Sequence, residues 1–301
     1  MTTDTQSSPV LLINQSLDCG EGPVWDVHGQ QLFWTDSDGD TIFSWREGAK
    51  EHSVLRKGVR AASITLHANG GLMLCGPKGF YHLQENGDVR VVAEMCDGRP
   101  IEYVNDIIAD PLGRVFGGQE KFHEGEVYDP GFLYRIDLDG CASVVEEGLH
   151  ISNGMAFSPD LSTFYLIDTI PRKVYAYDYH LGSGSISNRR VLLVFEQDQG
   201  LPDGMTVDRE GFLWIASWFG NGVLRFDPEG RLERTIPLPA AQTSSLTFGG
   251  KELNEIFVTS AATFWISELA PRGHDYDSDR GGGVYHIKQD IVGLPEYQAR
   301  V

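Results

Sequence analysis

"LPDGMTVDREGFLWIAS", residues 201–217, places one carboxylate, Asp203, directly before a glycine and an apolar run. The run is rich in β-branched and aromatic residues, a composition typical of a buried strand. A single acid at the start of a strand is explained by turn formation, because Asp accepts hydrogen bonds from nearby backbone amides. The same layout recurs along the chain, however, and turn formation at a single position does not explain that recurrence.

Five further stretches share this layout: a polar or small residue, an apolar run, a turn with Gly, Asp or Pro, and a second apolar strand. They are residues 21–36 (EGPVWDVHGQQLFWTD), 62–76 (ASITLHANGGLMLCG), 105–118 (NDIIADPLGRVFGG), 153–168 (NGMAFSPDLSTFYLID) and 244–260 (SSLTFGGKELNEIFVTS). Successive copies start 41 to 50 residues apart. A period of about 40 to 50 residues with about four strands per unit indicates a β-propeller.

The rest of each repeat consists of short alternating runs such as "TIFSW" and "GVLRFD", most of which lead into turns. Long helical periodicity is absent. We therefore predict an all-β, six-bladed β-propeller as a single domain over residues 9–301, after a polar tail at residues 1–8. The apolar "PVLLIN" (residues 9–14) is expected to add a strand to the last blade and close the ring, which hides sheet edges.

The innermost strand of each propeller blade lines the central channel, so the first residues of those strands should form a ring. Here the ring contains Glu21, Ala62, Asn105, Asn153, Asp203 and Ser244. Buried carboxylates that face each other repel, and a divalent cation relieves the repulsion. Carboxylate and amide oxygens suit Ca²⁺, Mg²⁺ or Mn²⁺, and Zn²⁺ is not excluded. The sequence thus predicts a central metal site; the alternative is that Asp and Asn only make turn hydrogen bonds.

The composition of the chain restricts the classes of partner that the protein is expected to bind. The 301 residues include 41% hydrophobic residues, and 43 acids against 24 bases make a formal charge of −19. This charge argues against nucleic acid and anionic membranes as partners. No run reaches the roughly 20 apolar residues that cross a bilayer. The first ten residues lack the basic and apolar parts of a secretory signal.

The four cysteines, Cys19, Cys75, Cys96 and Cys141, show no CxxC spacing. We interpret them as plain core or loop thiols of a cytoplasmic protein. The oligomeric state stays open.

Several motifs together resemble those of the senescence-marker-protein/gluconolactonase/luciferin-regenerating-enzyme family, which includes regucalcin-like proteins. They are "DCGEGPVW", "ISNGMAFSPD", "LPDGMTVDREGFLWIASW", "GVLRFDPEGRL" and "LTFGG" followed by "IFVTSA". The resemblance extends from about Asp18 to "GLPEYQ" near the end of the chain. It implies a six-bladed propeller with one catalytic divalent metal in the channel and, usually, hydrolysis of sugar lactones.

By matching motif, the resemblance implies that Glu21, Asn153 and Asp203 are the metal ligands. Asn105, in "NDIIADPLGR", would touch the substrate or lie just off the metal. The metal, most simply Ca²⁺, would polarise the lactone carbonyl. Asp203 would also act as general base toward water.

The substrate side of the site departs from the family pattern. Similar lactonases commonly carry an arginine two residues before this Asn, where this chain has Tyr103. Gln119 and Glu120 stand where the family often shows a small hydroxyl residue. We assign Tyr103, Gln119 and Glu120 to substrate binding. The departures leave open an atypical or less polar lactone.

Two other functions compete with a lactonase. A phosphotriesterase would use the same metal ring to polarise P=O, and a non-enzymatic propeller would bind calcium or a protein partner. Other catalytic schemes find no motif, since GxSxG, P-loop and GxGxxG patterns are all absent.

Three local features have structural explanations. Residues 36–47 (DSDGDTIFSWRE) resemble an EF-hand loop, but Thr41 stands where that loop requires Gly, so we predict a hairpin turn. His150 is expected to be structural. Trp218 is assigned equally to the pocket mouth and to the core.

Overall fold

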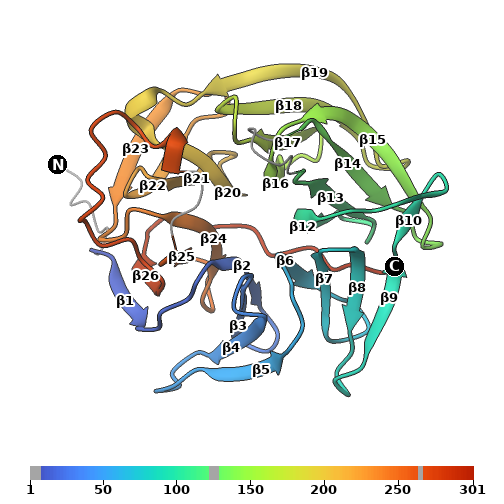
Figure 1. Cartoon of the computed structure of the whole chain (residues 1–301), viewed down its shortest axis with the longest axis horizontal. Coiled ribbons are helices and arrows are strands. Elements are labelled where there is room, and N and C mark those ends of the chain that lie inside the picture. Colours follow the sequence, from blue (N-terminus) through green and yellow to red (C-terminus); the bar gives the residue numbers. More distant parts are fainter. Residues whose placement is uncertain (1–7, 122–128, 264–266) are drawn as a thin grey trace.

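A computed structural model describes residues 8–121, 129–263 and 267–301. Six four-stranded antiparallel sheets surround a central axis, which confirms the predicted six-bladed β-propeller (Figure 1). The predicted polar tail at residues 1–8 lies almost entirely outside the described residues. Within the described ranges, no helix has the length and apolar character needed to span a membrane.

Each blade runs from an innermost to an outermost strand in chain order, apart from the sixth. Blade 1 contains β2 (Gly20–Asp26), β3 (Gln31–Asp36), β4 (Thr41–Arg46) and β5 (Ser53–Lys57). Blade 2 contains β6 (Ser63–Leu66), β7 (Leu72–Gly76), β8 (Gly79–Leu83) and β9 (Val89–Ala93). Blade 3 contains β12 (Val104–Ala109), β13 (Val115–Gln119), β14 (Gly131–Ile136) and β15 (Ala142–Leu149).

The second half of the ring repeats this order. Blade 4 contains β16 (Ser152–Phe157), β17 (Thr163–Asp168), β18 (Lys173–His180) and β19 (Ser185–Val194). Blade 5 contains β20 (Leu201–Val207), β21 (Leu213–Trp218), β22 (Gly222–Phe226) and β23 (Leu232–Pro237). Blade 6 contains β24 (Thr243–Gly249), β25 (Glu255–Ser260), β26 (Val284–Lys288) and β1 (Val10–Ile13). A short hairpin, β10 (Met95–Cys96) with β11 (Arg99–Pro100), joins blades 2 and 3.

Both ends of the chain tie the ring together. As predicted, the N-terminal β1 pairs with β26 as the outermost strand of blade 6. The C-terminal segment, residues 289–301, crosses the ring (Figure 1) and was not foreseen. Its backbone bonds to the first hairpin turn of blades 2, 3, 5 and 6. Those turns follow the innermost strands, so the segment covers the end of the channel opposite the strand starts.

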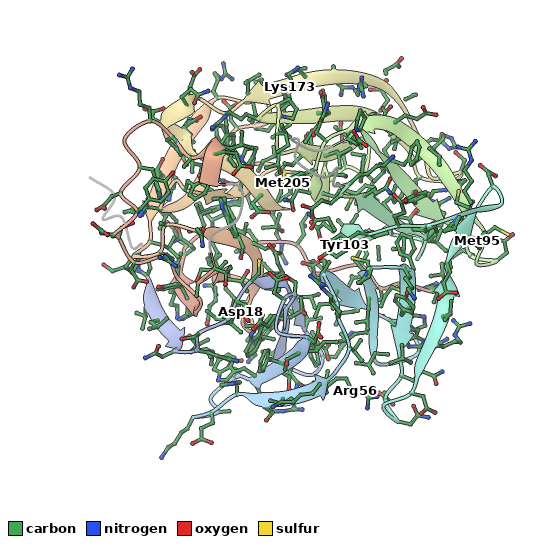
Figure 2. All side chains as sticks on the ribbon, viewed as in Figure 1. Asp18, Arg56, Met95, Tyr103, Lys173 and Met205 are labelled. Atoms are coloured by element: carbon green, nitrogen blue, oxygen red, sulfur yellow. The ribbon has the colours of Figure 1, made fainter. Side chains whose placement is uncertain are left out.

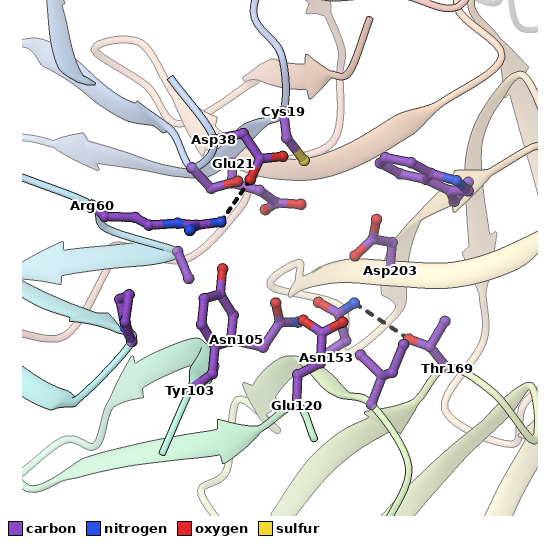
Figure 3. A pocket seen from close by; sticks show the side chains of 15 residues that line it. Cys19, Glu21, Asp38, Arg60, Tyr103, Asn105, Glu120, Asn153, Thr169 and Asp203 are labelled. Carbon is purple, nitrogen blue, oxygen red and sulfur yellow. Dashed lines mark hydrogen bonds and ion pairs between the residues drawn. The ribbon is translucent and has the colours of Figure 1, made fainter. Parts of the chain in front are cut away.

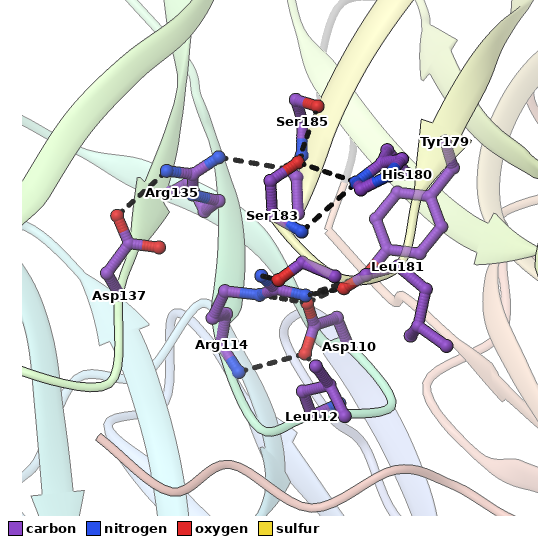
Figure 4. Close-up of polar contacts among 12 residues, drawn as sticks. Asp110, Leu112, Arg114, Arg135, Asp137, Tyr179, His180, Leu181, Ser183 and Ser185 are labelled. Atoms are coloured by element: carbon purple, nitrogen blue, oxygen red, sulfur yellow. Dashed lines mark hydrogen bonds and ion pairs between the residues drawn. The ribbon is translucent and has the colours of Figure 1, made fainter.

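The hydrophobic core lies between neighbouring sheets. Trp25 of blade 1 stacks on Phe257 of blade 6 with ring centroids 5.2 Å apart. Polar contacts add to this packing between blades 3 and 4 (Figure 4). There, the Asp110 carboxylate accepts the backbone N–H of Leu112 and the hydroxyl of Tyr179, both at 2.8 Å, and pairs with the Arg114 guanidinium. All charges of this network are buried and partnered, so it links the two blades without an uncompensated charge.

The innermost strands depart from regular pairing where the predicted ring begins. The pairing register shifts at or directly after Glu21, Asn105, Asn153, Asp203 and Ser244. A bulge re-aims one side chain out of the regular alternation. Four of these five residues, Glu21, Asn105, Asn153 and Asp203, line the central cavity. Ser244 does not: it is fully buried, and its hydroxyl donates to the Gly20 carbonyl at 2.5 Å.

Glycines that follow three ring residues let adjacent inner strands meet. A Cβ built on Gly154 would lie 2.4 Å from the backbone N of Met205 in the next blade. The same construction on Gly22 falls 2.8 Å from the N of Ile64, and on Gly204 it falls 2.6 Å from the Cα of Ser245. Real Cβ atoms do not approach backbone so closely, so the Glu-Gly, Asn-Gly and Asp-Gly pairs are needed for blade packing.

We predict that Gly154→Ala lowers the free energy of unfolding by about 1–3 kcal/mol or more, because β16 and β20 must separate to admit the methyl group. Chemical denaturation measures the change. The matched control is Gly182→Ala, where the nearest atom is the His180 Cε1 at 3.3 Å, at the end of a movable side chain. Equal stability of both variants would contradict the close-approach argument.

Candidate metal centre

A cavity of about 460 Å³ opens at the ring end of the channel (Figure 3). Tyr103, which belongs to its wall, lies near the middle of the ring, whereas Arg56 and Lys173 lie toward the periphery (Figure 2). Because the C-terminal segment covers the opposite end, a small molecule reaches the channel from this side.

Three positions of the repeat supply the cavity wall, with residues from blades 1 to 5. The ring position provides Glu21, Ala62, Asn105, Asn153 and Asp203. The position two residues earlier provides Cys19, Arg60, Tyr103 and Ile151. Residues at or just beyond the end of the second strand provide Ser37, Asp38, Pro77, Glu120, Thr169 and Trp218. The site is thus a direct product of the repeat.

Glu21 and Asp203 place two carboxylates in the wall of this cavity (Figure 3). Asp203 is 6% exposed. Burial, then the charges of Asp203 and Asp106, raise the pKa of Glu21 well above its usual value. Burial, then Asp106, raise the pKa of Asp203 in the same direction. Among the described residues, no positively charged side chain forms an ion pair with either carboxylate, and Arg60 of the same cavity pairs with Asp38 instead.

Asn153 presents an amide oxygen beside these carboxylates (Figure 3). Its amide nitrogen donates to the Thr169 hydroxyl at 3.3 Å, and that hydroxyl donates to the Pro202 carbonyl at 2.8 Å. With the nitrogen anchored in this way, the oxygen is left for another partner. The two hydrogen bonds, from Asn153 to Thr169 and from Thr169 to Pro202, fix which end of the amide faces the cavity.

These residues fit a hard divalent cation. Two carboxylates balance its charge, and a carboxamide oxygen adds a neutral ligand of the kind that Ca²⁺ and Mg²⁺ prefer. In the described part of the chain, no three His, Cys, Asp or Glu side chains form a cluster suited to a metal. The candidate set is therefore the mixed one of Glu21, Asp203 and Asn153.

The residues assigned to substrate binding divide into two groups. Asn105, Tyr103 and Glu120 line the cavity. Gln119 does not: it is buried, its amide nitrogen donates to Glu102 at 3.1 Å, and its oxygen accepts the Phe132 N–H at 3.3 Å. Successive strand residues point to opposite faces, so Gln119 and Glu120 do not share the cavity.

Two charged side chains of the cavity wall, Arg60 and Asp38, were not predicted from the motifs. Arg60, from the connection between β5 and β6, donates to Asp38 at 2.9 Å (Figure 3). Asp38 belongs to the turn between β3 and β4. Arg60 precedes Ala62 by two residues, as Tyr103 precedes Asn105, so the repeat register contained the signal that would have located it.

The structure also places the EF-hand-like stretch, His150 and Trp218. The EF-hand-like stretch is a turn followed by β4, as expected, with the Asp36 carboxylate accepting the Gly39 N–H at 3.2 Å. His150 is absent from the cavity wall; its backbone N–H donates to Asp168 at 2.9 Å. Trp218 fills both assigned roles, since it lines the cavity and packs in a buried cluster. All four cysteines are free.

The cavity carboxylates predict an unusual pH dependence for the metal-free protein. Burial, then the charge of Asp38, raise the pKa of Glu120 to about 7. The unfolded value is about 4.3. Between these values the folded state binds more protons, so the free energy of unfolding falls as pH rises from about 4.3 through about 7.

Glu120→Gln removes this contribution. In the presence of a chelator, we expect the melting temperature of the variant to fall less than that of the unmodified protein between about pH 5.5 and about pH 8. Thermal melts at the two pH values measure the difference. Identical pH slopes would show that Glu120 does not titrate in this window.

Comparison with known proteins places the chain among relatives of the same architecture. A family model described as the SMP-30/gluconolactonase/LRE-like region matches residues 19–262. The pentonolactonase XacC of Haloferax volcanii is 32% identical over 290 residues, which cover 96% of this chain and 97% of the relative. Regucalcin of Xenopus laevis is 33% identical over 281 residues, 92% of each chain.

Solved structures agree with this result. A luciferin-regenerating enzyme superimposes with a TM-score of 0.85 at 27% identity, over 98% of this chain and all of that one. The match of the family model over most of the chain and the two full-length relatives lead to one conclusion. The chain belongs to the SMP-30/gluconolactonase/LRE-like family.

Proposed function

We propose that this protein is a metal-dependent hydrolase that opens a lactone ring, with a sugar lactone as its substrate. The observation that supports the proposal is that Glu21, Asn153 and Asp203 all line one cavity. Two buried carboxylates without a protein counter-charge are costly unless a cation joins them. The name of one relative, a pentonolactonase, and the description of the family as gluconolactonase-like support lactones as the substrate class.

In this proposal, Glu21, Asp203 and the amide oxygen of Asn153 hold the cation, with Ca²⁺ as the first candidate. A bound divalent cation supplies Lewis-acid chemistry, polarising the lactone carbonyl and stabilising the negative charge that develops on its oxygen. Glu21 serves only to hold the cation and to balance part of its charge. Asn153 keeps its orientation through Thr169.

Asp203 takes the proton from the attacking water. Burial and then the charge of Asp106 raise the pKa of Asp203, and a hydrogen bond from Asn153 acts in the opposite direction. A cation beside Asp203 would favour the ionised form that a base needs. Water adds to the ester carbon, the ring C–O bond breaks, and the proton passes to the leaving alkoxide, so a hydroxy acid results. Asn105 lines the same cavity, and its amide donates to the Ser152 carbonyl at 3.4 Å, which leaves its oxygen to orient the ring.

A panel of substrates and metals tests this proposal. The chelated protein is assayed with aldonolactones, unsubstituted lactones and phosphotriesters after addition of Ca²⁺, Mg²⁺, Mn²⁺ or Zn²⁺ separately. We expect lactone hydrolysis that depends on added metal. Metal-dependent turnover of phosphotriesters alone would replace the proposal by a phosphotriesterase, and no turnover with metal bound would favour a binding protein.

Two variants separate the proton acceptor from the pure ligand. Asp203→Asn keeps an oxygen ligand and the side-chain volume but removes the base, so turnover should fall about 10²-fold or more at every metal concentration. Glu21→Gln should lose activity through metal affinity and recover in part at high metal. The measurement is turnover against metal concentration for both proteins. Full rescue of Asp203→Asn by excess metal would assign the base elsewhere.

A further inference from the structure

Arg60 is the only cationic side chain among the described residues that line the cavity. It stands among four carboxylates: Glu21, Asp38, Glu120 and Asp203. A strongly acidic wall disfavours a phosphorylated substrate, because like charges repel in a partly desolvated site. A single cation in such a wall needs an explanation of its own.

The position of Arg60 fits ligand binding better than support of the fold. Its side chain enters the cavity (Figure 3), and its guanidinium carbon lies 5.8 Å from the centroid of the Tyr103 ring. The side chain is 47% exposed, and its partner Asp38 is 21% exposed. Exposed ion pairs of this kind contribute about 0–1 kcal/mol to stability. Asp38 and Tyr103 thus orient Arg60 without burying it.

The polar groups beside Arg60 form a set of hydrogen-bond donors and acceptors. The guanidinium has five N–H groups, and the pair with Asp38 engages one of its terminal nitrogens. The Asp38 and Glu120 carboxylates can accept hydrogen bonds, and the Tyr103 phenol can both donate and accept them. Burial raises the pKa of Tyr103 above its usual value, so the phenol keeps its proton at neutral pH.

This set matches neighbouring hydroxyl groups on a sugar ring. Each hydroxyl can accept from the guanidinium and donate to a carboxylate, so that both kinds of group are satisfied together. A lactone without hydroxyls would desolvate the same groups and offer them nothing. Sites of this type reject the analogue that lacks the hydroxyl because their polar groups are left unpaired.

We propose that Arg60, oriented by Asp38 and Tyr103, determines substrate specificity by binding hydroxyl oxygens of an unphosphorylated, polyhydroxylated lactone. The inference rests on the proposed lactonase function and adds a residue that selects its substrate. Arg60 does not touch the ester that reacts, so it acts on the choice of substrate and not on the chemical step.

The test compares two lactones of the same ring size, one polyhydroxylated and one unsubstituted, using the metal-loaded protein. Arg60→Met keeps most of the length and removes the charge. We expect kcat/KM for the polyhydroxylated lactone to fall about tenfold to a hundredfold, mainly through KM, and kcat/KM for the unsubstituted lactone to change by less than about threefold. Arg60→Lys keeps the charge without the fork of donors and should recover only part of the loss.

Arg190→Met is the matched control. Arg190 is also a half-exposed arginine paired with an aspartate, Asp178, at 2.8 Å, and it lies on the outer strand β19, away from the cavity. This variant should keep both kcat/KM values. A second measurement is independent of turnover: calorimetric binding of a polyhydroxylated lactam, which lacks the scissile ester, should weaken in Arg60→Met and not in Arg190→Met.

The outcomes separate the two proposals. Equal losses of kcat/KM on both lactones, or no loss on either, would overturn the role of Arg60 while leaving lactone hydrolysis in place. Unchanged lactam affinity in Arg60→Met would overturn it as well. If the unmodified protein with metal hydrolyses neither lactone, the proposed function fails and this inference fails with it.

Discussion

Adjacent inner strands approach so closely at the axis that a side chain has no room at one position of the strand. Gly154 shows the constraint most clearly, because a Cβ there would lie 2.4 Å from the backbone of β20. The residue just before it, Asn153, belongs to a bulged stretch of β16 and turns to the axis instead. Blade packing and the polar ring are therefore two consequences of one local geometry.

This coupling explains why much of the fold and part of the site could be predicted from sequence. The two-residue pairs Glu21-Gly22, Asn153-Gly154 and Asp203-Gly204 mark both a polar cavity residue and a close backbone contact at the same position of blades 1, 4 and 5. The strand β1 was predictable because an apolar run before the first repeat has no other sheet to join.

Other features could not be derived from local patterns. The C-terminal segment has no regular secondary structure over most of its length, and its position depends on turns from four separate blades. Gln119 illustrates a different limit. The motif placed two consecutive residues at the substrate, but a strand directs neighbours to opposite faces, and only Glu120 lines the cavity.

Arg60 shows how a substitution at one position of a repeat can be understood only in three dimensions. The sequence places Tyr103 where similar lactonases carry an arginine, which by itself suggests a less polar substrate. In the structure, however, a guanidinium from the neighbouring blade lies over the Tyr103 ring, at the corresponding position of the preceding repeat. A positive charge on this side of the cavity can thus come from either of two adjacent blades. Loss of an arginine in one repeat says little about the pocket until the same position in its neighbours is considered.

The excess of acidic side chains in the cavity affects both the stability of the metal-free fold and the proposed activity. Without a cation, burial and then the charges of Asp203 and Asp106 raise the pKa of Glu21, and burial and then Asp106 raise that of Asp203. Burial raises the pKa of Asp106 itself to about 6. A hydrophobic replacement in the ring would relieve the cost of ionisation and stabilise the metal-free fold, but it would remove the ligands. The carboxylates are best understood as groups whose ionised form is unfavourable alone and favourable with a divalent cation. In the proposed function, the same repulsion that weakens the metal-free protein would therefore contribute to the affinity for the cation on which the chemistry depends.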